Sequence, residues 1–114
     1  MLENELQLKK RRLLLPLLNK LESELRKQGL WQVGKPSASA LSSTAPFAID
    51  TLTFVQWLQF IFLDKMSYLL QFALPLPESM SVLPMAEEYF KNRSVNSAEI
   101  TEIIGRIDLL ISEK

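Results

Sequence analysis

The sequence has no cysteine and no histidine, and it contains only three glycines in 114 residues. Without cysteine and histidine, the usual zinc sites and the Cys–His and Ser–His–Asp catalytic arrangements are excluded. Three isolated glycines also exclude a glycine-rich loop that cradles phosphate. Valine occurs only four times whereas leucine is abundant, which favours helices over sheets. The length suits one domain with one hydrophobic core.

The chain has no net charge, because 13 basic residues balance 13 acidic ones. The two signs are unevenly distributed along the sequence. Residues 1–35 carry eight basic and four acidic side chains, whereas residues 36–114 carry five basic and nine acidic ones. This separation indicates either helices that attract one another within the fold or a surface that binds a partner.

Export and membrane insertion are not expected from the sequence. The apolar run Leu13–Leu18 follows the basic residues Lys9–Arg12, but it is too short for a secretory signal and contains Pro16. The most apolar window, residues 52–74, is interrupted by charged and amide side chains, which a transmembrane helix avoids. We therefore expect a cytoplasmic protein.

The first helix is predicted from about Leu2 to Gln28, with leucines at helical spacing on one face and Gly29 at its end. Pro16 lies inside this pattern and removes a backbone hydrogen bond, so we expect a kink or break near Leu15. Residues 1–12 are therefore predicted to be an N-terminal extension, helical or frayed, and residues 13–114 to be the folded domain.

Three further helices are predicted after a long connection over residues 34–51, whose apolar residues Leu41, Phe47 and Ile49 should pack on the core. The second helix begins after Thr53, which forms a capping-box pattern with Gln56. Two mostly apolar stripes along this helix should face its neighbours, and they are Phe54, Trp57, Leu58, Ile61, Lys65, Tyr68, Leu69 and Phe72 on one side and Val55, Phe62, Met66 and Leu70 on the other. A third helix is expected over residues 81–92. A fourth follows Asn96, whose side chain is predicted to cap it, and it carries isoleucines on one face. The fold is therefore predicted to be all-α, a closed four-helix bundle with a long packed loop between helices 1 and 2.

One set of spaced motifs resembles the YqcC-like family of small bacterial four-helix proteins. The motifs cover most of the chain between Leu13 and Ile111, and they are Trp31, Pro46-Phe47, Asp50-Thr51, Trp57-Leu58-Gln59, Met66, Leu69-Leu70 and Pro75-Leu76-Pro77. Two positions depart from the family pattern, because Gln56 and Asp64 stand where members often have glutamate and proline. The resemblance implies a four-helix bundle and an association with tRNA pseudouridine synthase C. It does not imply synthase activity, since that chemistry needs a much larger mixed α/β catalytic domain.

Candidate partner-binding residues lie in the long connection and at the start of the second helix: Phe47, Asp50, Thr51, Gln56 and Phe60. Phe60 falls between the two apolar stripes of its helix, where an exposed aromatic side chain indicates a partner surface. The alternative for Asp50 and Thr51 is a structural turn or cap, and the alternative for the aromatic residues is core packing.

Candidate phosphate-binding residues are Lys9, Lys10, Arg11 and Arg12, which could attract RNA or anionic lipid. The alternative is a solvated turn of the N-terminal extension. Enzyme activity is not expected, because no nucleophile, base and oxyanion donor are combined. No cofactor or metal is expected either.

The predicted function is that of a non-catalytic binding or adaptor protein, accessory to a tRNA-modifying pseudouridine synthase, with a protein as its partner. Two alternatives remain at this point. One is an RNA-binding module acting through the basic first helix, and the other is a small-molecule binder with a pocket between helices.

Overall fold

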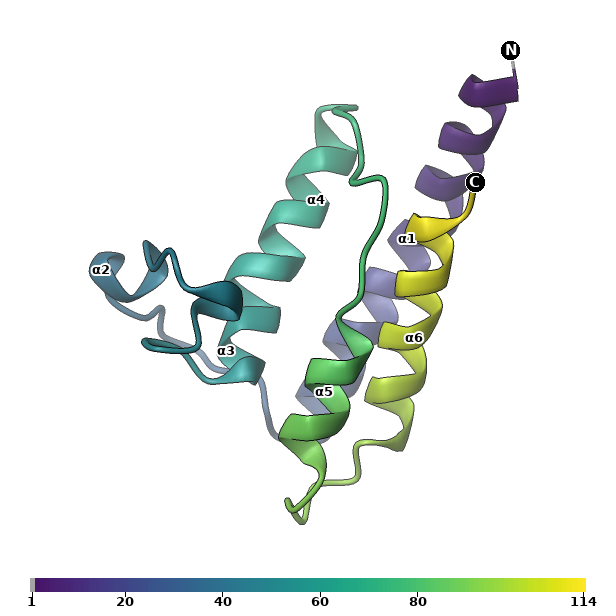
Figure 1. The fold of residues 1–114 in the computed structure, drawn as a ribbon. Coiled ribbons are helices and arrows are strands. Elements are labelled where there is room, and N and C mark those ends of the chain that lie inside the picture. Colours follow the sequence, from purple (N-terminus) through teal and green to yellow (C-terminus); the bar gives the residue numbers. More distant parts are fainter. Residues whose placement is uncertain (1) are drawn as a thin grey trace.

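The computed structural model describes residues 2–114, with side chains from residue 5 onward, and these residues form helices and connections without strands (Figure 1). The elements in order are α1 (Leu2–Lys27), α2 (Ala38–Leu41), η1 (Pro46–Ala48), α3 (Phe54–Trp57), η2 (Leu58–Leu63), α4 (Asp64–Gln71), α5 (Leu83–Phe90) and α6 (Ala98–Ser112). The all-α class is confirmed. The described chain divides into more than four helices, so a closed four-helix bundle stays a prediction.

Helix α1 runs without interruption through Pro16, so the break predicted near Leu15 is absent. Pro16 and Arg12 are both exposed, so the hydrogen bond that Pro16 cannot donate to the Arg12 carbonyl is lost on the solvent side of the helix. The helix ends as predicted at Gly29, whose φ is 73°, while the Leu30 amide donates to the Leu25 carbonyl at 2.8 Å. The division into residues 1–12 and 13–114 stays a prediction, and a continuous helix crosses it.

Helices α1 and α6 lie side by side and antiparallel, and both ends of the chain reach the same end of the molecule (Figure 1). The predicted apolar faces of both helices are buried, and their members are Leu14, Leu18, Leu21, Leu25, Ile100, Ile103, Ile104, Ile107 and Ile111. The cap predicted at Asn96 is shifted, because Ser97 occupies the N-cap position. The Asn96 side chain accepts only a long hydrogen bond of 3.4 Å from the Ala98 amide.

The segment α3–η2–α4 is one continuous helical rod with a π-helical stretch in its middle. The predicted capping box is confirmed, because the Thr53 side chain accepts from the Gln56 amide while the Gln56 side chain accepts from the Thr53 amide. A π turn holds more residues than an α turn, so it rotates every later side chain around the rod. Tyr68 and Phe72, predicted to face inward, are consequently both 55% exposed.

The connection between α1 and α3 carries the short helices α2 and η1 and extends to one side of the bundle (Figure 1). Phe47 and Ala48 have φ of 55° and 49°, a left-handed conformation that costs energy for residues other than glycine. This conformation turns Phe47 onto the core and buries Ala48. The packing predicted for Ile49 is wrong, because Ile49 is 63% exposed.

Helix α5 is shorter than predicted and begins beside α6. The Asp108 carboxylate of α6 accepts hydrogen bonds from the amides of Val82 (2.9 Å) and Leu83 (2.8 Å), so a side chain from another helix caps α5. Pro84 lies in the first turn, where its missing N–H has no helical acceptor. Among the described helices, none has the length and apolar character needed to cross a membrane.

Candidate functional site

The basic tract Lys9–Arg12 lies on α1 beside the C-terminal ends of two other helices. Lys10 is only 3% exposed, and its Nζ donates a 2.8 Å hydrogen bond to the Ile111 carbonyl in the last turn of α6. A helix end carries carbonyl groups without helical donors and a partial negative charge, so a buried cation stabilises it. Lys10 thus has a structural role, and its ammonium group is occupied by the end of α6.

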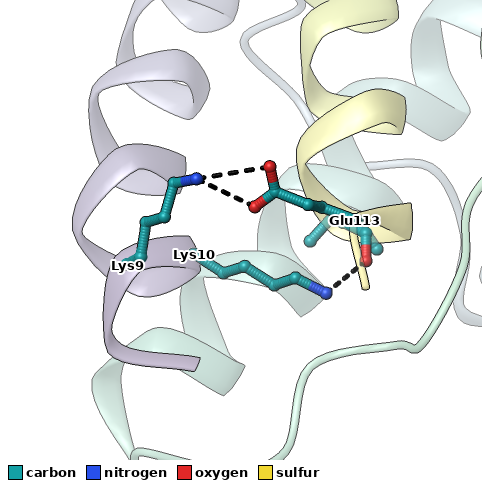
Figure 2. Close-up of polar contacts among 4 residues, drawn as sticks. Lys9, Lys10 and Glu113 are labelled. Atoms are coloured by element: carbon teal, nitrogen blue, oxygen red, sulfur yellow. Dashed lines mark hydrogen bonds and ion pairs between the residues drawn. The ribbon is translucent and has the colours of Figure 1, made fainter. Parts of the chain in front are cut away.

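Lys9 reaches the same end of α6 from the surface. Figure 2 shows its Nζ pointing to both carboxylate oxygens of Glu113, and the two distances are 3.2 and 3.0 Å. Both side chains are more than 40% exposed, so this ion pair is weak and easily exchanged for another anion. Lys9 and Lys10 together tie the first helix to the last one.

Arg11 contacts the other helix end, at the C-terminus of α4. Its guanidinium group donates to the Leu69 carbonyl at 3.4 Å and to the Leu74 carbonyl. Arg12 points away, is exposed, and makes no hydrogen bond or ion pair within the described chain. Successive helical side chains are 100° apart, so the four predicted phosphate ligands do not form one surface. Within this tract, Arg12 is the cation that the described contacts leave available.

Among the predicted partner-binding residues, Phe60 lies at a groove. It is half-buried on η2 and, with Trp31, lines a hollow of about 210 Å³ between α1, the connection after α1, and η2. The polar residues at the edge of this hollow are Glu22, Lys35, Gln59, Asp64 and Ser67. Trp31 is held by the Arg26 guanidinium group, which lies 4.5 Å from the centre of its ring. The groove therefore combines two aromatic side chains with charges of both signs.

A glutamine network fixes the wall of this groove. The buried Gln59 side chain pairs with the main chain of Gln32, accepting from its amide at 2.9 Å and donating to its carbonyl at 2.7 Å. Gln56 donates from its Nε2 to the Gln32 Oε1 at 3.1 Å, in addition to its part in the capping box. Gln56 thus has a structural role, and the network sets where Trp31 lies relative to Phe60.

The remaining predicted residues stabilise the connection before α3. The Asp50 carboxylate accepts a 2.5 Å hydrogen bond from the Ser43 hydroxyl, and the Thr51 hydroxyl donates to the Ala40 carbonyl at 2.7 Å. Phe47 packs edge-on against Trp57 with ring centres 4.8 Å apart. Phe47 makes the core contact that its structural alternative describes. Asp50 and Thr51 are exposed, and they bond to a hydroxyl and to carbonyl groups of the same connection instead of to the amides at the start of α3.

Sequence reasoning missed Gln32 and the place of Trp31 in the groove. The structural role of Gln59 could have been inferred from the sequence, because its amide side chain lies within a mostly apolar helical segment and a buried amide needs hydrogen-bond partners. The sequence does not indicate Gln32 as that partner, because Gln59 bonds to its main-chain amide and carbonyl groups, which every residue except proline has. The π turn that turns Phe60 toward Trp31 had no sequence signal either.

The carboxylates of the described residues do not form a metal-binding cluster. Among residues 5–114, no three acidic side chains lie together in a way that could hold a metal ion. Several carboxylates serve structural contacts, as Glu22 with Arg26, Glu102 with Arg106 and Asp108 at the α5 cap show. At least four larger hollows, of about 590, 620, 400 and 390 Å³, occur elsewhere among the described residues and are open to solvent.

Comparison with known proteins gives the family. The profile of the family DUF446, described as tRNA pseudouridine synthase C, matches residues 13–110. The chain belongs to this YqcC-like family. The resemblance seen in the sequence is thereby confirmed.

Three relatives differ in how much of their length the chain covers. An uncharacterised protein of Haemophilus influenzae is 32% identical over 92 residues, 81% of this chain and 87% of its own length. YqcC of Escherichia coli is 30% identical over 96 residues, 84% of this chain and 88% of its own length. The protein of Pectobacterium carotovorum named tRNA pseudouridine synthase C is 38% identical over 73 residues, 64% of this chain but only 19% of its own length.

The fold also matches an experimental structure. The solution NMR structure of E. coli YqcC is similar with a TM-score of 0.77 and 28% sequence identity, covering 95% of this chain and 89% of that chain. The all-helical arrangement is therefore shared with a relative of nearly the same length. The family description and the Pectobacterium protein carry the name of an enzyme, whereas the Haemophilus protein and YqcC do not.

Proposed function

We propose that this YqcC-like protein is a non-catalytic adaptor that binds a tRNA-modifying pseudouridine synthase. The observation that carries this proposal is the Pectobacterium protein, in which a region similar to this chain makes up 19% of a longer chain named tRNA pseudouridine synthase C. Two domains in one chain stay at high effective concentration, so they need little affinity to act together. Separate chains must supply that affinity through an interface.

The groove around Phe60 is the proposed contact surface for the synthase. Partly exposed aromatic side chains with a polar edge are typical of protein interfaces, and a few such side chains carry most of the binding energy. The left-handed Phe47-Ala48 turn and the exposed Ile49 lie in the connection that precedes this helix and extend the surface away from the bundle. A closed bundle of the longer helices would serve as its rigid support, and the cytoplasm, where tRNA is modified, is the proposed location.

The absence of catalysis in this chain is part of the proposal. Its support is that histidine and cysteine are missing and that the carboxylates named above hold caps or ion pairs. The alternative of an RNA-binding module acting through Lys9–Arg12 is less favoured, because Lys10 and Arg11 are bonded to helix ends. A single cation gives little affinity for a polyanion.

The test is a binding measurement between this chain and the pseudouridine synthase of the same organism, by calorimetry and by size-exclusion chromatography with light scattering. We expect a stoichiometric complex that Phe60→Ala weakens about tenfold or more, as loss of an aromatic anchor does. The matched control is Phe72→Ala on the same rod but outside the groove, which should leave the affinity within about twofold. No complex at high micromolar concentrations, or equal losses in both variants, would overturn the proposal.

A further inference from the structure

The outward face of α1 has a feature that the linear sequence hides. Every exposed residue between positions 8 and 27 is either basic or uncharged, and none is acidic. These residues are Leu8, Lys9, Arg12, Leu13, Leu15, Pro16, Asn19, Lys20, Ser23, Arg26 and Lys27. The acidic residues in this stretch, Glu22 and Glu24, lie on the flanks of this face, and Glu22 is paired there with Arg26. One side of the molecule therefore presents a basic stripe about 30 Å long.

Three cations of this stripe are available to a partner. Lys9 pairs with Glu113 and Arg26 pairs with Glu22, whereas Arg12, Lys20 and Lys27 have no hydrogen bond or ion pair among the described side chains. At 1.5 Å per residue, Arg12 and Lys20 are about 12 Å apart along the helix, and Lys20 and Lys27 about 11 Å. The three cations thus form a row and not a cluster.

A row of this kind fits a polyanion better than a single anionic group. A nucleic-acid duplex carries a phosphate charge about every 1.7 Å of its axis, so cations spaced along a straight helix meet phosphates in any register. Basic side chains that reach only phosphates position a protein without reading bases. The rest of the chain is acidic, since residues 36–114 carry nine acidic and five basic side chains, and it would be repelled.

We propose that the outward face of α1, through Arg12, Lys20 and Lys27, binds the phosphate backbone of a folded RNA. The choice of RNA rests on the proposed function, because an adaptor of a tRNA-modifying enzyme works next to an RNA substrate. A lipid surface is less favoured, because an interfacial helix buries a continuous apolar face in the membrane. The main leucine face of α1 is buried against α6 and the rod, and the exposed leucines Leu8, Leu13 and Leu15 are interspersed with basic and polar residues.

The experiment measures the binding of a labelled RNA hairpin, with a stem longer than α1, to the full-length protein by fluorescence anisotropy. If the three cations each neutralise one phosphate and release its counterions, the binding constant should fall about 40-fold between about 50 mM and about 200 mM salt. The triple variant Arg12→Gln, Lys20→Gln, Lys27→Gln should bind at least about tenfold more weakly at the lower salt concentration. All three residues are exposed, so the far-ultraviolet circular dichroism should not change.

The matched control removes the same number of positive charges from other faces of the molecule. Lys65→Gln, Lys91→Gln, Lys114→Gln removes three exposed cations outside α1 and should change the affinity by less than about threefold. Equal losses in both triple variants, salt-independent binding, or no binding would overturn the proposal. Loss of binding to phosphatidylglycerol vesicles in the first variant, without RNA binding by the unchanged protein, would assign the face to a membrane instead.

The two proposals fail separately. The triple variant on α1 keeps Phe60, so it should bind the synthase as tightly as the unchanged chain. A protein that binds RNA but no synthase would overturn the adaptor function alone, and a protein that binds synthase but no RNA would overturn the role of α1 alone.

Discussion

The pair α1–α6 and the rod α3–η2–α4 with its preceding connection are built in different ways. Helices α1 and α6 keep regular geometry over their length and bury uniform rows of leucine and isoleucine, and the Lys10 side chain of α1 donates to the C-terminal end of α6. The rod contains a π turn, and the connection before it contains two left-handed residues and a network of glutamines. The first region therefore supplies stability, and the second supplies a shaped groove.

The two proposed surfaces therefore have different physical origins. The basic stripe of α1 follows from helical periodicity alone, because its members lie on the face opposite the buried leucines. The groove around Phe60 depends on irregular geometry held by specific hydrogen bonds. Substitutions should therefore affect the two regions differently, because one region loses apolar packing and the other loses specific hydrogen bonds.

The largest expected effect is in the regular pair. Leu21→Ala removes a side chain with 0% exposure and should lower the free energy of unfolding by about 2–5 kcal/mol, because it leaves a cavity in the core. Leu15→Ala, on the exposed side of the same helix, should cost less than about 1 kcal/mol. Urea unfolding measures both changes. Similar losses at the two positions would contradict the orientation of α1.

Gln59→Leu tests the irregular region. The variant leaves the amide and carbonyl groups of Gln32 without their partners, so the free energy of unfolding should fall by about 2 kcal/mol. The fluorescence of Trp31 should also change, since the segment that carries it is released. Gln71→Leu is the matched control on an exposed position and should shift stability by less than about 0.5 kcal/mol. A stable variant with unchanged fluorescence would show that the network does not shape the groove.

Lys10→Met tests how the ends of the regular pair are fixed. It should lower the free energy of unfolding by about 1–2 kcal/mol, because the Ile111 carbonyl loses a charge-assisted hydrogen bond while the length of the side chain is kept. Lys9→Met breaks only an exposed ion pair and should cost about 0–1 kcal/mol. Chemical denaturation of both variants gives the comparison, and a reversed order would contradict the burial of Lys10.

The smallest expected effect is at the start of the rod. Thr53→Ala removes the capping box and should cost about 1 kcal/mol. Ser97→Ala, at the start of α6, should cost less, because the Ser97 side chain makes no capping bond. Thermal unfolding of the two variants gives the difference. An equal loss would mean that residue type and not the observed bond decides stability at these positions.

Much of the fold could be predicted from residue spacing. The buried leucines of α1, the buried isoleucines of α6, the end of α1 at Gly29 and the capping box at Thr53 all depend on contacts within a few residues. Prediction was wrong where a local rule competed with packing. Pro16 does not break α1, because its missing hydrogen bond lies on the solvent side. Tyr68 and Phe72 do not face inward, because the π turn shifts the face of the rod.

The candidate site was predictable only in part. Phe60 was singled out because of its position between two apolar stripes, and the structure places it at a groove edge. Its neighbour Trp31 comes from a segment 29 residues earlier in the chain, and no periodicity links the two. The basic tract was visible in the sequence, but its four charges face different neighbours once they lie on one helix.

The sequence by itself determined the helical class, the apolar faces of α1 and α6 and the separation of charge along the chain, because these depend on residue type and on a period of 3.6 residues. The tertiary structure alone decided which cations remain available and where the aromatic residues meet. The physical reason is that helix ends need donors and buried amides need partners, and only the packed chain brings those groups together.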